Sequence, residues 1–162
     1  MGTALQRFRI TANTHRKFDA WEYDFTGRFE DSTRGTPIFE LPSLGGTDTV
    51  RGFRTDDAVG QRLWSVQSEL WRPIPALNPS HFSNPQIQTV LEALRLSPFF
   101  DLGGAYQTTA SRPGLRAGVG LGLRLDLQVA VLKFDWAYGF GDAASGGSRG
   151  KFYFSACLNF QH

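Results

Sequence analysis

The chain has 162 residues, enough for one domain, and its 18 glycines and 14 phenylalanines favour strands and turns over helices. Its formal net charge is +2, from 17 basic and 15 acidic residues, which is too balanced for a nucleic-acid-binding protein. One cysteine, Cys157, excludes a disulfide framework, and His15, His81 and His162 lack metal-ligand spacing, so we expect no metal and no cofactor.

The N-terminal stretch MGTALQRFRI has charges at Arg7 and Arg9 before any long apolar run, so we expect no signal peptide. Seven segments then alternate apolar and polar residues with a period of two, which predicts strands with one apolar face. The alternation is clearest at 115–127, where leucine, alanine and valine occupy every odd position. The predicted strands span 5–16, 20–30, 62–72, 95–107, 115–127, 129–140 and 151–160.

The length and polarity of these strands favour a membrane barrel over a soluble sandwich. They are longer than the usual strand of about 5–6 residues, and about 9–11 residues cross a bilayer. Their polar faces carry Arg, Lys, Asp and Gly, as expected in a barrel lumen. Aromatic residues near the strand ends, where an interfacial girdle is expected, are Trp21, Trp71, Tyr106, Tyr138 and Phe160. The predicted fold is therefore all-β: an antiparallel up-and-down membrane β-barrel.

Two connections are longer than tight turns. Between 73 and 94, Asn84 is a candidate N-cap, Pro85 fits a first helical turn, and apolar residues follow at helical spacing. We therefore expect a short periplasmic helix there. The longest connection, 31–61, contains LGGTDTVRGF at 44–53, and a loop of this length without secondary structure is usually functional.

Arg51 in this loop has two candidate partners. Strand parity turns Glu69 and Asp101 toward the lumen on adjacent strands, where a guanidinium group can pair with both. We predict that the 31–61 loop folds into the lumen, that Gly52 permits a close approach, and that Phe53 packs near two more glycines. Those glycines are Gly103 and Gly104.

Several segments together resemble a known family. VRGF, formed by Val50, Arg51, Gly52 and Phe53, follows LGGTDT and precedes SELWRPI at 68–74 and FFDLGGAY at 99–106. GLRAGVGLGLRLDL at 114–127, LKFDWAYGF at 132–140 and KFYFSACLNF at 151–160 complete the series. In this order and spacing, the chain resembles the C-terminal half of the BamA/TamA-superfamily barrel, which includes the two-partner-secretion transporters.

The resemblance implies that the VRGF motif is the tip of a lumen loop whose Arg meets acidic residues, at positions matched by Glu69 and Asp101. It also implies that the last strand carries a signal read by the assembly machinery, formed here by Phe152, Phe154, Leu158 and Phe160. The implied function is outer-membrane protein insertion or polypeptide translocation, in a bacterial-type outer membrane. The implied partners are outer-membrane lipid and unfolded outer-membrane or secreted polypeptides.

The chain departs from the family pattern in three ways. POTRA domains and the first barrel strands are absent, Phe160 is followed by Gln161 and His162 where the family's last strand usually ends in an aromatic residue, and the 73–94 connection is longer than the usual inner turn. The predicted strand count is also odd, whereas bacterial single-chain barrels have an even count. We therefore expect residues 1–162 to be the C-terminal portion of a barrel, closed by missing N-terminal strands or another chain. No catalytic constellation is evident, so we expect no enzyme activity. The alternatives are a passive porin-like or structural barrel and a soluble ligand-binding β-barrel.

Overall fold

The computed structural model describes residues 6–74, 79–107, 114–127, 130–141 and 150–158. Seven long strands form one antiparallel sheet in the order β1-β2-β5-β6-β7-β8-β9, so each strand pairs with its neighbour in sequence. The strands are β1 (Arg7–Phe18), β2 (Trp21–Ser32), β5 (Arg62–Pro73), β6 (Leu94–Tyr106), β7 (Gly114–Asp126), β8 (Ala130–Gly141) and β9 (Lys151–Leu158). The up-and-down, all-β fold is that of an open barrel fragment, which confirms the predicted fold class.

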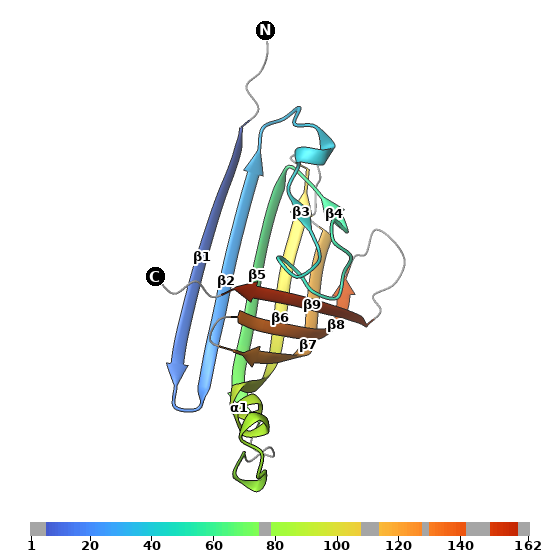
Figure 1. Cartoon of the computed structure of the whole chain (residues 1–162). Helices are drawn as coiled ribbons and strands as arrows, with labels where there is room; N and C mark the ends of the chain where they lie inside the picture. The colour runs from blue at the N-terminus through green and yellow to red at the C-terminus, as the bar shows by residue number, and fades with distance from the viewer. Residues whose placement is uncertain (1–5, 75–78, 108–113, 128–129, 142–149, 159–162) are drawn as a thin grey trace.

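The sheet curls strongly from β1 to β9. Figure 1 shows β8 and β9 coming round in front of the middle strands, while β1 and β2 stand at the opposite side. β1 and β9 are the two edges of the sheet, because neither has a second strand neighbour among the described residues. The curl gives the sheet a concave inner face and a convex outer face.

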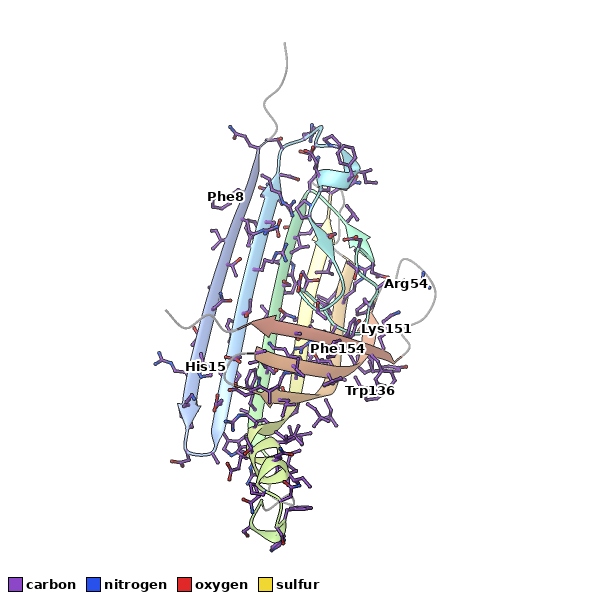
Figure 2. The ribbon with its side chains drawn as sticks, viewed as in Figure 1. Phe8, His15, Arg54, Trp136, Lys151 and Phe154 are labelled. Carbon is purple, nitrogen blue, oxygen red and sulfur yellow. The ribbon has the colours of Figure 1, made fainter. Side chains whose placement is uncertain are left out.

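The two faces differ in chemistry as the period-two pattern predicts. Large apolar side chains on the outer face are exposed, among them Phe8, Ile10, Phe100, Leu121, Phe134, Trp136, Phe140, Phe152 and Phe154. The inner face instead buries polar and charged groups, including Glu30, Ser97, Asp101, Arg116, Arg124 and Asp135. Figure 2 shows Phe8, Trp136 and Phe154 with the other side chains along the ribbon.

Near the open β1 edge, the inner face concentrates positive charge. The buried carboxylate of Glu30 pairs with Arg7 at 2.6 Å, with Arg9 at 2.9 Å and also with Arg28. Toward the other end of the same two strands, His15 Nδ1 lies 2.6 Å from an oxygen of Asp24. Three guanidinium groups thus share one carboxylate beside an edge strand.

The connection between β5 and β6 contains the predicted helix. The 3-10 turn η2 (Pro79–His81) precedes α1 (Pro85–Ala93). The Oδ1 atom of Asn84 accepts a hydrogen bond from the backbone N–H of Gln86 at 2.9 Å, so Asn84 is the N-cap and Pro85 occupies the first turn. In Figure 1, α1 lies at the end of the sheet remote from β3 and β4.

The loop between β2 and β5 returns onto the inner face of the sheet. It contains the 3-10 turn η1 (Ile38–Glu40) and a two-stranded ribbon of β3 (Ser43–Leu44) and β4 (Ala58–Val59). A small apolar core fixes this loop to the wall, formed by Leu44, Val50, Phe53, Leu63 and Ala105. The VRGF segment is therefore packed against the sheet, and its Arg51 is buried at the inner face.

One sequence-based placement is wrong. Trp71 was expected in an outer aromatic girdle, but its ring lies on the inner face, 5.5 Å from Lys133 Nζ and 5.9 Å from the guanidinium carbon of Arg124. The alternation of β5 explains this, because Glu69 and Trp71 are two residues apart and share a face. Trp21, by contrast, lies 4.7 Å from the guanidinium carbon of Arg72.

Candidate functional site

The turn that presents Arg51 is built by glycines and a threonine clasp. Gly45, Gly46 and Gly52 all have positive φ, at 121°, 83° and 96°, which side chains with a β-carbon rarely adopt. The hydroxyl of Thr49 accepts a hydrogen bond from Gly45 N at 2.7 Å and donates one to Gly45 O at 3.1 Å. This closed turn sets Val50 and Arg51 toward the wall.

Arg51 makes its closest set of contacts with Asp101 on β6. Its Nε and Nη2 atoms donate to the two carboxylate oxygens at 2.8 Å each, and its backbone N–H donates to Oδ2 at 3.0 Å. The guanidinium carbon also lies 3.5 Å from the ring centroid of Phe99, close enough for a cation–π contact. A planar fork matched to a carboxylate is the geometry that Arg provides and Lys does not.

The remaining nitrogen of Arg51 reaches two further strands. Nη1 lies 2.9 Å from Glu69 Oε2 on β5 and 3.2 Å from Asp135 Oδ2 on β8. Burial alone would lower the pKa of Arg51, but its hydrogen bond to Asp101 and the three nearby carboxylates raise this pKa above its usual value. Arg51 therefore stays charged and ties the loop to three strands at once.

The structure thus brings together the residues predicted as the loop motif and as its partners, and it adds Asp135. Parity already placed Asp135 on the inner face, but only the curl of the sheet brings β8 back to the loop. Arg124 on β7 was also missed: its Nε donates to Glu69 Oε1 at 2.7 Å, and its Nη1 lies 2.6 Å from Asp135 Oδ1. Ser97 donates to the same Glu69 oxygen at 2.8 Å.

The last strand closes over the loop through Tyr153, a further residue that sequence reasoning missed. Its hydroxyl accepts a hydrogen bond from Gly52 N at 2.9 Å and donates one to Phe53 O at 2.7 Å. The sequence did offer one signal of this contact, a tyrosine on the polar face of β9. These two bonds connect the C-terminal strand directly to the VRGF backbone.

The ring of Phe53 packs against a glycine that was not predicted. A β-carbon on Gly139 would lie 2.7 Å from Cε2 of Phe53, so the ring packs at Gly139. Gly103 does provide a close approach, but to the side chains of Leu44 and Val50, whose nearest atoms would lie 2.8 and 3.0 Å from an added β-carbon. The curl of the sheet again explains the difference, because Gly139 belongs to β8.

Glycines on the inner face of β7 make room for the whole arrangement. A β-carbon on Gly118 would overlap the carbonyl oxygen of Arg51, and one on Gly120 would overlap the Phe99 ring. The same change at Gly122 would press on both Asp135 and Arg124. The alternating glycines of GVGLG are therefore a signal, readable in the sequence, that the loop and large side chains of the sheet itself lie over this strand.

A second ion pair fixes the far side of the loop. Arg116 on β7 donates through Nε to Asp57 Oδ2 at 2.8 Å, and both side chains are buried. The guanidinium carbon of Arg116 also lies 5.8 Å from the ring centroid of Phe53. The loop therefore has two ion-paired anchors, its own Arg51 and its Asp57, besides its apolar core and its bonds to Tyr153.

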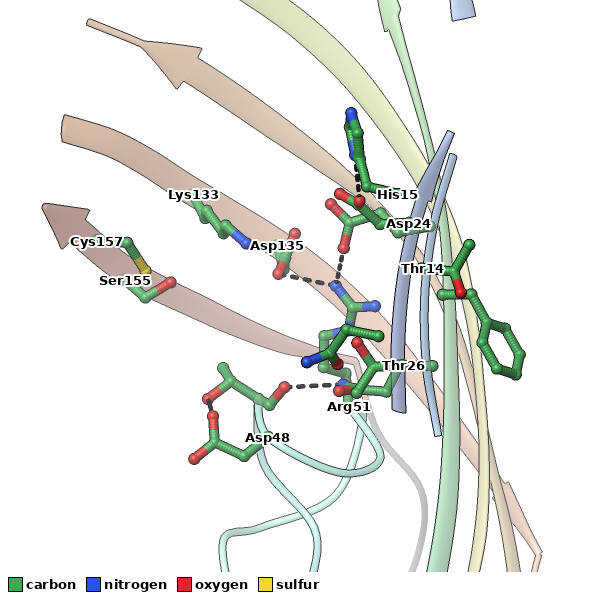
Figure 3. A pocket seen from close by; sticks show the side chains of 15 residues that line it. Thr14, His15, Asp24, Thr26, Asp48, Arg51, Lys133, Asp135, Ser155 and Cys157 are labelled. Carbon is green, nitrogen blue, oxygen red and sulfur yellow. Dashed lines mark hydrogen bonds and ion pairs between the residues drawn. The ribbon is translucent and has the colours of Figure 1, made fainter. Parts of the chain in front are cut away.

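Beside Arg51, a polar cavity of about 470 Å³ extends toward the edge strands. Figure 3 shows Arg51 with Asp135 on one side and the side chains of β1, β2 and β9 around the opening, including His15, Asp24, Ser155 and Cys157. Among the described residues, no group of three or more His, Cys, Asp or Glu side chains is placed to hold a metal ion.

The predicted C-terminal signal lies only partly within the described residues. Phe152 and Phe154 are exposed on the outer face, and the ring centroids of Phe154 and Phe134 are 4.8 Å apart. The backbone of Leu158 pairs with Ala130, whereas Phe160 lies outside the described residues. Two of the four proposed signal residues therefore present their rings outward.

Comparison with known proteins agrees with this architecture. A family model described as the Omp85 superfamily domain matches residues 7–160, nearly the whole chain. A comparison with curated proteins gave no match. Within the described part of the chain, α1 is too short and no other helix is long or apolar enough to cross a membrane.

Proposed function

Because this chain belongs to the Omp85 superfamily, we propose that it is the C-terminal wall of an outer-membrane barrel that inserts barrel precursors or translocates polypeptides. Superfamily members are outer-membrane proteins of bacterial-type envelopes, and their barrels engage lipid and polypeptide substrates. In this proposal the docked VRGF loop is a brace inside the lumen, and the face with Phe134 and Phe154 contacts lipid.

The observation that carries the proposal is the burial of the Arg51 guanidinium among carboxylates from three strands. Taking a guanidinium group out of water costs several kcal/mol, which only close and well-oriented partners offset. Asp101, Glu69 and Asp135 provide such partners at 2.8–3.2 Å. A passive pore has no need of an ion-paired loop across its wall, whereas a barrel that opens for a substrate needs an internal brace.

The outer surface supports the membrane location. Phe152 is 83% exposed and Phe154 is 62% exposed, and they continue a band of exposed leucine, phenylalanine and tryptophan across β6, β7 and β8. A soluble monomer seldom exposes a contiguous apolar patch of more than a few hundred Å². This band argues against the soluble ligand-binding barrel.

We further propose that residues 1–162 form the C-terminal portion of the barrel domain. In the described part of the chain, β1 and β9 have no outer neighbour, and such edges would leave backbone N–H and C=O groups without partners in lipid, where no water replaces them. N-terminal strands of a longer protein, or strands of another chain, would complete the barrel. Insertion and secretion remain two versions of one proposal, distinguished by their substrates.

The test is Arg51→Ala in the intact protein, reconstituted in lipid vesicles. Insertion of an unfolded outer-membrane barrel and passage of a secreted polypeptide are measured in separate arms. Arg54→Ala is the matched control, because Arg54 is an exposed arginine in the same loop. We expect Arg51→Ala to lose activity in one arm while the strands stay assembled, and Arg54→Ala to keep it. Full activity of Arg51→Ala in whichever arm is active would refute the proposed brace.

A further inference from the structure

Arg124 and Arg51 share two carboxylates, those of Glu69 and Asp135. Glu69 gives Oε2 to Arg51 and Oε1 to Arg124, at 2.9 and 2.7 Å. Asp135 Oδ2 accepts a hydrogen bond from Arg51 at 3.2 Å, and its Oδ1 lies 2.6 Å from Arg124 Nη1 as an ion pair without hydrogen-bond geometry. For both shared carboxylates, the shorter contact is with Arg124. Only Asp101 pairs with Arg51 without such sharing.

The two arginines differ in where they are anchored. Arg51 belongs to the connection between β2 and β5, whereas Arg124 belongs to a central strand and is fully buried. Its Nη1 also donates to its own strand, at the carbonyl of Leu123, over 3.1 Å. Arg124 is thus anchored to its own strand independently of the loop.

We propose that Arg124 is a resident counter-ion that makes docking of the VRGF loop reversible. When Arg51 leaves, Arg124 remains as the cation beside Glu69 and Asp135. These two carboxylates of the undocked wall therefore keep a neighbouring positive charge. When Arg51 returns, it finds both side chains held in position by their other oxygens. The biological use of reversible docking rests on the proposed function. The docking equilibrium itself can be measured without any substrate.

The sign of the effect separates this role from a simple structural one. Removing the charge of Arg124 raises the free energy of the undocked wall more than that of the docked one, because the docked wall keeps Arg51. The loop should then open less often. If Arg124 served only to hold Glu69 and Asp135 in place, its loss would loosen the receptor and the loop would open more often.

Arg116 provides a matched control on the same strand and the same face. It too is buried, but its carboxylate partner, Asp57, belongs to the loop. Arg116→Gln removes a bond made only in the docked state and should increase opening. Arg124→Gln should decrease it. Two identical substitutions eight positions apart are thereby expected to act in opposite directions.

Hydrogen–deuterium exchange of the intact protein in detergent measures the opening. The Arg51 and Gly52 amides report docking, because they donate to Asp101 and Tyr153. We expect exchange at these amides to slow at least about fivefold in Arg124→Gln and to quicken by a similar factor in Arg116→Gln. Arg124→Lys, which keeps the charge, should exchange as the wild type does.

Unchanged or faster loop exchange in Arg124→Gln overturns the inference. If that variant does not assemble, Arg124→Lys decides: assembly with wild-type loop exchange supports a counter-ion, and failure to assemble or a faster-opening loop refutes it. No substrate enters this experiment. A negative result in the insertion and secretion assays would therefore refute the proposed function and leave the loop measurement standing.

Discussion

Adding one methyl group to β7 should push the VRGF loop off the wall. The substitution is Gly118→Ala, on the inner face, where the new β-carbon would overlap the carbonyl oxygen of Arg51. It would also lie 3.1 Å from the carbonyl carbon of Arg51 and 3.5 Å from Val50 Cγ1. Carbon atoms pack best at about 3.5–4.0 Å, so backbone, rather than a flexible side chain, has to move.

The size of the effect follows from the overlap. Overfilling a packed site costs about 1–3 kcal/mol. The gain of about 0.4–1 kcal/mol that alanine brings over glycine acts through the unfolded chain, so it does not enter the docking equilibrium, in which β7 stays folded. The overfilling cost therefore falls on the docked loop and should raise its opening equilibrium about 5- to 150-fold.

Gly27→Ala is the control for this prediction. Gly27 also lies in a long strand, but a β-carbon there would meet only Cε1 of Phe25, at an ordinary 3.7 Å. Loop amide exchange in the intact protein measures both variants, with the mobility shift of unheated samples on a gel reporting barrel assembly. Equal loop exchange in Gly118→Ala and Gly27→Ala would show that the loop does not press on β7 as described.

The other predictions concern single contacts of the loop and of the lipid face. Arg51→Lys should give loop exchange between those of wild type and Arg51→Ala, because an ammonium group lacks the planar fork; exchange as slow as wild type would contradict this. Tyr153→Phe removes the hydroxyl bonded to Gly52 N and should weaken docking by about 0.5–1.5 kcal/mol, seen as faster exchange of that amide; unchanged protection would refute the bond. Phe154→Arg should lower the assembled fraction on a gel, since Arg at mid-bilayer costs about 2–4 kcal/mol, whereas Ser155→Arg on the opposite face should be tolerated; equal loss in both would argue against this assignment of faces.

The sequence predicted the strands well because a period of two is a local property. Every boundary of the seven long strands lies within two residues of its expected position, and the capped helix at Pro85 follows from Asn84 and the proline itself. The short strands β3 and β4 were not expected, because the 31–61 connection was predicted to be a loop without secondary structure. The pairing of Arg51 with Glu69 and Asp101 was also foreseeable, since parity alone turns both carboxylates inward. Local patterns were sufficient wherever the partners lie on the strands just after the loop.

The missed contacts of β8 and β9 with the loop depend on curvature. Asp135 and Tyr153 reach the loop only because the sheet turns β8 and β9 back over it, and alternation gives the face of a residue but not its height or the curl of the wall. Trp71 was misplaced for a different reason: a composition rule about aromatic residues at strand ends was applied against the parity of β5. The glycines of β7 were the overlooked signal, since side chains are missing there where another segment has to fit.

The directions of the two edge strands restrict how the sheet can close. Neighbouring strands are antiparallel throughout, so β1 and β9, first and last of seven, run the same way. Joining them to each other would create a parallel seam, and so would a second copy inserted with the same orientation in the same membrane. An antiparallel closure instead requires an odd number of intervening strands, with the first and last of these both running opposite to β1 and β9. In an antiparallel barrel, the strand that pairs with β1 and the strand that pairs with β9 must therefore run in the same direction as each other, whatever their sequences are.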